Sequence, residues 1–342
     1  MTLHPKLAGV RSSLILVPAA LAVLFLAGWR RATLNAAPQP ALTASAAVTE
    51  ATITFPFQGR ARSAVLIVPT AAPPATGFPV VLLLHGAGGS GKQMLEKDGW
   101  RDVATRERFA VIAADGTPKN ETRRAFIVGN PRTWNSGIRS GLSNTDGSAS
   151  AKDVDDVSYL AALLDSVAQR TTVNTRRVYV AGHSNGGGMS YRFAAEHPER
   201  VAAVGVMAGH LSANAPAALP TPVPLLQIVG DHDPLMPMSG GVVKLGRVSS
   251  TVAPALDSPT RWASMLGIHA DARIIRDDSV TVRQWGNASS DAVVLSYVVK
   301  GHGHAWLFPG ADPLPGSMLG PRREAINATE TMWAFFAAHA RR

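Results

Sequence analysis

Residues 177–195 read RVYVAGHSNGGGMSYRFAA, and they decide the fold. A short apolar segment rich in β-branched residues runs through Gly-x-Ser-x-Gly, Gly182 to Gly186, into a helix-permissive run. This order is typical of a nucleophile elbow, in which a sharp strand-to-helix turn exposes a serine hydroxyl. Small residues are needed where the strained turn approaches neighbouring chain. We therefore predict that Ser184 is a nucleophile and that the Asn185 backbone N–H faces the oxyanion formed during acyl transfer.

The composition fits one large domain behind an N-terminal extension. The chain has 342 residues, 46% of them hydrophobic, which is enough to bury a full core. It has no cysteine, which excludes disulfides, a thiolate nucleophile and cysteine-ligated metal. The net charge is +9, but no basic cluster with interleaved aromatic residues indicates a nucleic-acid partner. We predict a signal peptide or membrane anchor plus linker over residues 1–46, and a catalytic domain over residues 47–342.

The N-terminus has the pattern of an export signal. Lys6 and Arg11 precede an apolar run, residues 14–27, that is short for a membrane span. The small residues of 44–46, Ala-Ser-Ala, form a candidate cleavage site. Retention of residues 12–29 as an anchor is the alternative. Either outcome predicts an extracellular or periplasmic location, with membrane contact only through an uncleaved anchor.

Apolar runs alternate with amphipathic runs along the rest of the chain. An antiparallel hairpin is expected first, over residues 51–68. The expected later strands are 80–84, 110–114, 201–208, 224–229, 280–285 and 292–299, and the expected helices are 94–109, 153–169, 258–266 and 324–339. Uniformly apolar strands that alternate with helices predict an α/β fold with a mostly parallel, doubly wound sheet. Catalytic groups gather at the carboxyl ends of such strands.

Three further strand ends carry candidate chemistry. The glycine-rich loop 85–91 is not followed by the Gly-Lys-Ser/Thr of a phosphate-binding loop, because Gln93 follows Lys92. It suits the second half of an oxyanion hole, with Ala87 as the favoured N–H donor and Gly88 as the alternative. An Asp231/Asp233 pair and a His302/His304 pair follow two later strands. The chain order serine, acid, histidine is that of α/β-hydrolases. Members of each pair are two residues apart, so their spacing leaves the choice within each pair open.

A long polar loop, residues 117–151, contains Trp134. Loops of this length in compact domains are commonly functional. A tryptophan in such a loop either stacks on substrate or anchors the loop to the body of the protein. We predict Trp134 as a substrate-binding residue and keep the anchor as an equal alternative.

With these motifs the chain resembles the exported α/β-hydrolases that include polyhydroxybutyrate depolymerases and the feruloyl and acetylxylan esterases of carbohydrate esterase family one. The resemblance covers most of residues 60–340, and its specific segments are 84–91, 153–157, 185–189, 230–234 and 303–306. It implies that the acid is Asp233, which precedes a proline. It also implies that the base is His304, which precedes a small residue and tryptophan.

The sequence therefore predicts an exported serine esterase that forms an acyl-enzyme. His304 would deprotonate Ser184, Asp233 would orient His304, and the N–H groups of Ala87 and Asn185 would hold the oxyanion. A polyhydroxybutyrate or polyhydroxyalkanoate depolymerase-like activity is expected first, and a feruloyl or acetylxylan esterase is the alternative. A serine peptidase and an inactive binding protein are lesser alternatives. The expected partner is a small or polymeric ester, with no nucleic acid, and no cofactor or metal is implied.

Overall fold

The computed structural model describes residues 47–127, 129–138, 147–245, 248–287, 290–308 and 316–341. The predicted signal peptide or anchor, residues 1–46, lies outside them. Within these ranges, no helix combines the length and the apolar character that a bilayer crossing requires.

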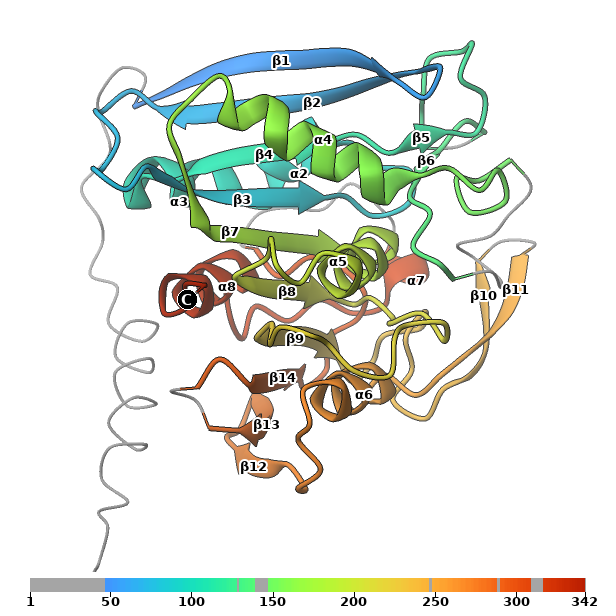
Figure 1. Cartoon of the computed structure of the whole chain (residues 1–342). Coiled ribbons are helices and arrows are strands. Elements are labelled where there is room, and N and C mark those ends of the chain that lie inside the picture. The colour runs from blue at the N-terminus through green and yellow to red at the C-terminus, as the bar shows by residue number, and fades with distance from the viewer. Residues whose placement is uncertain are drawn as a thin grey trace, which may run out of the picture. The chain divides into compact units, whose positions relative to one another are not determined.

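A ten-stranded sheet forms the centre of the described structure, in the order β1-β2-β4-β3-β7-β8-β9-β14-β13-β12 (Figure 1). Its strands are β1 (Val48–Phe57), β2 (Arg60–Pro69), β3 (Phe78–Leu84), β4 (Ala110–Ala114), β7 (Val173–His183), β8 (Ala203–Met207), β9 (Leu225–Gly230), β12 (Arg273–Arg276), β13 (Val280–Gly286) and β14 (Val293–Val299). Strands β4, β3, β7, β8, β9 and β14 are parallel neighbours. The hairpin β1–β2 and the pair β12–β13 add antiparallel strands at the two edges. The predicted fold class is confirmed.

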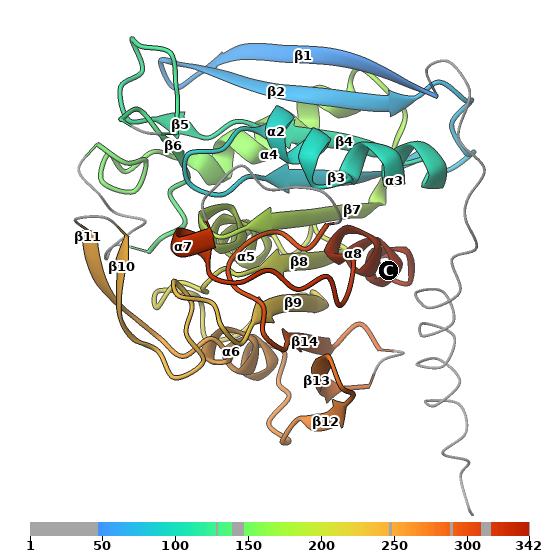
Figure 2. The ribbon, with the colours of Figure 1, turned by 180° about the vertical axis from the view of Figure 1, so that it is seen from behind.

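The central strands are apolar because helices cover both faces of the sheet. Every residue of β3, β4, β8 and β9 is buried. Helices α4 (Asp156–Ala168), α5 (Asn185–Glu196) and α6 (Asp257–Met265) lie on one face, as Figure 1 shows. Helices α2 (Gly91–Lys97), α3 (Trp100–Glu107) and α8 (Ala328–Ala337) lie on the other face (Figure 2). A strand buried on both sides needs apolar side chains in both directions, which explains the uninterrupted runs.

The single helix predicted over residues 94–109 is wrong, because the chain forms α2 and α3 with a break between them. Gly99 at the break has φ 78° and is the N-cap residue of α3. A Cβ at this position would lie 2.0 Å from Cε2 of Phe308. Glycine is therefore required both by the backbone conformation and by the packing of a residue far along the chain.

Several short helices and strands were not predicted from the sequence. Two small two-stranded sheets pair β5 (Thr117–Pro118) with β6 (Arg132–Thr133), and β10 (Gly241–Leu245) with β11 (Val248–Val252). A one-turn helix, α7 (Gly316–Leu319), precedes α8. These elements lie at the end of the domain where the arrowheads of β7 and β8 point (Figure 1). They therefore surround the carboxyl ends of the parallel strands.

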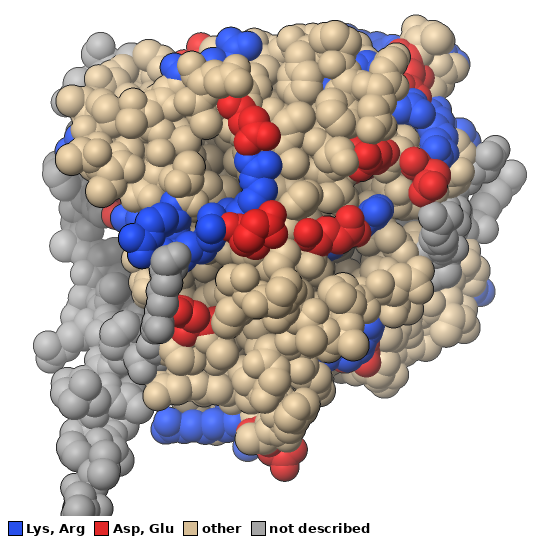
Figure 3. Space-filling model, in the orientation of Figure 1, with Lys and Arg blue, Asp and Glu red and all other residues tan. Residues whose placement is uncertain are grey.

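Charges of both signs are interspersed on the face that α4, α5 and α6 cover (Figure 3). Arg192 pairs with Glu196 within α5, and Arg200 pairs with Asp165 of α4. Exposed pairs of this kind contribute about 0–1 kcal/mol each. The stability of the fold therefore rests on the buried sheet and its helices.

Candidate active site

Ser184 lies at a sharp turn between β7 and α5. Its backbone has φ 52° and ψ −118°, a conformation that costs about 1–3 kcal/mol for a residue other than glycine. The turn fits because its neighbours carry no side chain. A Cβ on Gly182 would lie 2.3 Å from the Gly186 carbonyl oxygen, and a Cβ on Gly186 would lie 2.0 Å from the Leu84 carbonyl oxygen. The two glycines of the motif therefore allow the elbow to close against β3.

The serine meets a histidine and a carboxylate from two other strand ends. Ser184 Oγ lies 2.9 Å from His304 Nε2, and His304 Nδ1 lies 2.7 Å from Asp233 Oδ2. Asp233 and His304 are both buried, with 3% and 5% of their surface exposed. The three residues follow β7, β9 and β14, which lie within the four consecutive sheet strands β7-β8-β9-β14. The structure thus brings together the three side chains that the sequence analysis proposed.

Backbone donors fix the charge of the carboxylate. Asp233 Oδ1 accepts hydrogen bonds from the N–H groups of Leu235 (2.8 Å) and Met236 (2.9 Å). Burial raises the pKa of Asp233, but its attraction to His304 and these hydrogen bonds outweigh burial, so the pKa lies below the usual value. The ionised carboxylate accepts from Nδ1–H, which leaves Nε2 of neutral His304 as an acceptor for the serine proton.

The second member of each candidate pair has a structural role. Asp231 Oδ1 accepts the Gly301 N–H at 2.6 Å, which ties the loop after β9 to the loop after β14. His302 bonds through Nε2 to the Ala305 carbonyl at 2.9 Å, and its Nδ1 accepts the Arg323 N–H at 3.1 Å. Neither side chain has a hydrogen bond to Ser184. The geometry favours Asp233 and His304, in agreement with the resemblance.

Hydrogen bonding in the loop after β3 distinguishes between Ala87 and Gly88 as the candidate oxyanion donor. The Gly88 N–H donates to the Arg132 carbonyl at 2.8 Å and is occupied. Across the described ranges, the N–H groups of Ala87 and Asn185 have no hydrogen-bond partner. Asn185 is also the first residue of α5, where the helix dipole favours negative charge. Ala87 and Asn185 are therefore the available donors beside the serine.

The structure favours the loop-anchor alternative for Trp134 over the predicted substrate contact. Its side chain has 0% exposed surface, and its Nε1–H donates to the His85 carbonyl at 3.0 Å. Its backbone N–H donates to Asn185 Oδ1 at 2.7 Å, and Asn185 Nδ2 donates back to the Trp134 carbonyl at 3.1 Å. Trp134 is thus the anchor of its loop, and it fixes the Asn185 side chain beneath the elbow.

A buried ion pair supports this loop from below. Arg62 of β2 and Asp156 of α4 lie 2.7 Å apart, with side chains only 3% and 0% exposed. The second carboxylate oxygen of Asp156 accepts the Asn135 N–H at 2.7 Å. The sequence did not predict this pair. Nothing in the local sequence distinguishes buried Asp156 from exposed Asp153 and half-buried Asp155.

Two other histidines near the strand ends, His85 and His210, were assigned no role from the sequence. His85 Nδ1–H donates to the Gly86 carbonyl at 2.7 Å, and its Nε2 accepts the Gly116 N–H at 3.0 Å. Burial lowers the pKa of His85 to about 4. His210 follows β8, and both of its ring nitrogens are buried without a hydrogen-bond partner in the described part of the chain. Burial, followed by the nearby His304, lowers the pKa of His210 to about 4. His85 and His210 are therefore neutral near pH 7.

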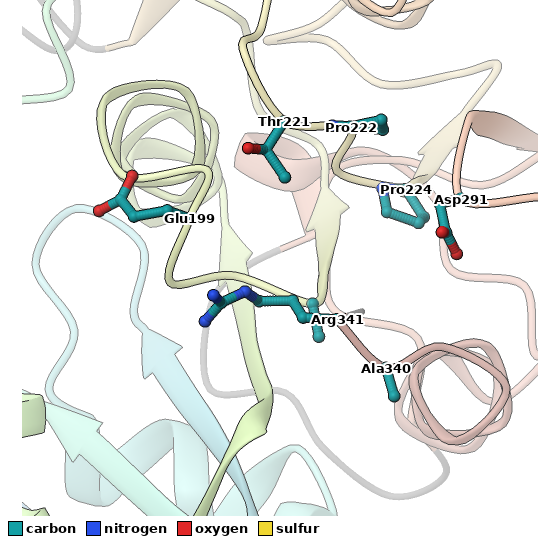
Figure 4. A pocket seen from close by; sticks show the side chains of 8 residues that line it. Glu199, Thr221, Pro222, Pro224, Asp291, Ala340 and Arg341 are labelled. Atoms are coloured by element: carbon teal, nitrogen blue, oxygen red, sulfur yellow. The ribbon is translucent and has the colours of Figure 1, made fainter.

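A surface cavity of about 410 Å³ lies elsewhere (Figure 4). Its lining includes Ala202 and Pro224, which directly precede β8 and β9, together with Arg341 near the C-terminus. The cavity is therefore at the amino ends of these strands. Ser184 and Asp233 follow the carboxyl ends, so the cavity is separate from the candidate active site.

Comparisons with known proteins identify the family. The family model described as "Putative esterase" matches residues 58–301. The chain is 33% identical over 165 residues to "Putative esterase NocK" of Nocardia uniformis subsp. tsuyamanensis, covering 48% of this chain and 42% of that protein. It is 27% identical over 184 residues to feruloyl esterase C of Emericella nidulans, covering 53% of this chain and 58% of that protein. The matches thus span about half the length of these curated relatives.

Two solved structures share the fold. The acetyl xylan esterase of Aspergillus awamori superposes with a TM-score of 0.53 at 15% identity, over 85% of this chain and 99% of that chain. The native structure of pOPH superposes with a TM-score of 0.52 at 15% identity, over 88% and 90% of the two chains. The family match and the fold agree: the chain belongs to this esterase family and has the α/β-hydrolase fold.

Proposed function

We propose that the chain is an exported serine esterase that hydrolyses feruloyl or acetyl esters of plant polysaccharide. The observation that carries the catalytic part is the continuous hydrogen-bonded series Ser184, His304, Asp233 at the carboxyl ends of β7, β14 and β9. The choice of ester is supported by relatives whose names state feruloyl and acetylxylan esterase activity. The pattern of residues 1–46 supports export.

The geometry supports a two-step reaction. His304 Nε2 takes the proton from Ser184 Oγ as this oxygen attacks the ester carbonyl carbon. The N–H groups of Ala87 and Asn185 stabilise the negative oxygen of the tetrahedral intermediate. The departing alcohol receives the proton from His304, which leaves an acyl group on Ser184. Water then attacks the acyl carbon as His304 removes its proton, and collapse of the second intermediate releases the acid and returns the proton to Ser184.

Polyester hydrolysis is a second candidate because apolar side chains are exposed around the site. Phe126 and Ile127 are 51% and 44% exposed, and a Cβ on Gly88 of the oxyanion loop would lie 2.9 Å from Ile127 Cγ1. Val242 of the β10–β11 hairpin is 68% exposed. Met318 is exposed in α7, whose Leu319 carbonyl accepts the His304 N–H. An exposed apolar rim suits a water-insoluble chain of short hydroxyacyl esters.

A paired substrate panel separates the two candidates. Methyl ferulate and a soluble 3-hydroxybutyrate oligomer would be compared with the full chain, with Ser184→Ala as the matched control. The proposal predicts a higher kcat/KM for methyl ferulate, whereas a preference for the oligomer would favour the polyester candidate. If neither ester is hydrolysed faster than by Ser184→Ala, feruloyl ester hydrolysis and polyester hydrolysis are both wrong.

Export has its own test. The intact mass of the protein recovered from producing cells, together with its cell fraction, shows whether residues 1–46 are removed. The proposal predicts a mature or anchored protein outside the cytoplasm. Full-length protein in the cytoplasm alone would contradict it.

A further inference from the structure

We propose that His183, the residue directly before Ser184, is a positioning residue that holds His304 at hydrogen-bond distance from the serine. His183 Nε2 lies 2.8 Å from the His304 carbonyl oxygen. A carbonyl oxygen only accepts, so Nε2 carries the hydrogen, and Nδ1 of the neutral ring carries none. The inference rests on the proposed esterase reaction and adds a residue to it.

The bond joins the elbow to the loop that carries the base. His304 is held on one side of its backbone by its own N–H, which donates to the Leu319 carbonyl at 2.6 Å. Its carbonyl is held on the other side by His183. Because His183 and Ser184 are consecutive, one turn of chain sets both the position of the nucleophile and the position of the base. A misplacement of about 1 Å between reacting groups can cost on the order of 10² in rate.

Packing against neighbouring aromatic rings restricts the orientation of the His183 ring. Its centroid lies 5.3 Å from the His304 ring and 5.9 Å from the Trp306 ring, which it meets edge to face at 83°. A Cβ on Gly86 would lie 3.2 Å from Nδ1, so the oxyanion loop passes close to this ring. The His183 ring therefore lies near both the base loop and the oxyanion loop.

The His183 ring must be neutral to position His304 without repelling it. Burial, followed by the nearby His304, lowers the pKa of His183 to about 4, against the raising effects of the bond to the His304 carbonyl and of Asp233. His302 also faces the ring and lowers its pKa. A charged His183 would oppose the imidazolium that forms on His304 during the reaction. A neutral donor holds the carbonyl without that repulsion.

Two substitutions separate the hydrogen bond from the packing. His183→Leu removes the donor and keeps an apolar side chain, whereas His183→Gln keeps an N–H donor on a side chain of similar reach. We expect His183→Leu to lower kcat for methyl ferulate by about 10- to 100-fold with KM within twofold of wild type. His183→Gln should recover most of kcat. His269→Gln, at an exposed position, is the matched control.

The rate of labelling by a fluorophosphonate provides the second readout. This reagent reacts with an activated serine without a cognate ester, so it tests the inference even if the proposed substrate is wrong. Labelling of His183→Leu should slow in parallel with kcat, and labelling of His183→Gln should not. If His183→Leu fails to fold, His183→Met, which also lacks an N–H donor, replaces it in the comparison with His183→Gln.

Two results would overturn it. One is a folded His183→Leu that retains wild-type kcat and wild-type labelling. The other is an equal loss in the Leu and Gln variants that follows their melting temperatures, because that would show a packing role without positioning.

Discussion

Acidification from pH 7 to pH 4 should weaken the fold through buried neutral histidines, and His85 is the clearest case. In its folded position Nδ1–H donates to the Gly86 carbonyl and Nε2 accepts the Gly116 N–H. A proton added to Nε2 would face that N–H and abolish the bond. Burial lowers the pKa of His85 to about 4. The folded protein therefore resists a proton that the unfolded chain accepts.

The size of the effect follows from the two pKa values. An unfolded histidine titrates near pH 6.5, so above that pH neither state binds the proton. Between pH 6.5 and pH 4 only the unfolded state binds it, and the free energy of unfolding falls by about 1.4 kcal/mol per pH unit. The loss from His85 alone is about 3 kcal/mol, complete near pH 4. His183, with its pKa also lowered to about 4, adds a similar loss.

The assay is urea unfolding, followed by tryptophan fluorescence, of wild type and His85→Gln at pH 7, 6, 5 and 4.5. The variant should be less stable at pH 7, because it loses hydrogen bonds in a buried place. Its stability should then fall less steeply, so that the two curves converge by about 2–3 kcal/mol over this range. All other titrating groups are common to both proteins. Parallel curves would refute the argument, and His269→Gln should give a curve parallel to wild type.

Three further predictions concern the support of the site. Asp156→Asn leaves buried Arg62 without its carboxylate and should lower the free energy of unfolding by about 3–5 kcal/mol, measured in urea; an unchanged midpoint would contradict the buried pair. Gly186→Ala places a Cβ 2.0 Å from a carbonyl oxygen and should lower kcat on the order of 10², and wild-type kcat would count against the elbow geometry. Trp134→Phe should lower stability by about 1 kcal/mol with KM for methyl ferulate unchanged. A raised KM at unchanged stability would instead indicate that Trp134 contacts the substrate.

Much of the fold follows from local sequence. The parallel strands are buried on both faces, so their apolar runs mark them without knowledge of their neighbours. The elbow is equally local, since Gly182 and Gly186 are required by atoms that any strand-to-helix turn of this kind brings close. The chain order of nucleophile, acid and base, together with the expected strand ends, predicted which residues form the candidate active site.

The features that were missed depend on distant parts of the chain. Trp134 is buried because His85 and Asn185, about 50 residues away on either side, receive its hydrogen bonds. The break between α2 and α3 is fixed in part by Phe308, some 200 residues later. The spacing of Asp231 and Asp233 left either as the acid, and only the structure shows that Asp231 bonds to the Gly301 N–H. A local sequence pattern cannot predict contacts between such distant residues.

The most direct test of the central claim, that Ser184 is the nucleophile of an ester hydrolase, is the intact mass of the protein after reaction with a fluorophosphonate. Wild type should gain one phosphonyl group, located on the peptide that contains Ser184. Ser184→Ala should gain none, should fold normally, and should lose about 10⁴- to 10⁶-fold in kcat for its ester substrate. Attachment to another residue, or wild-type hydrolysis by Ser184→Ala, would contradict the claim.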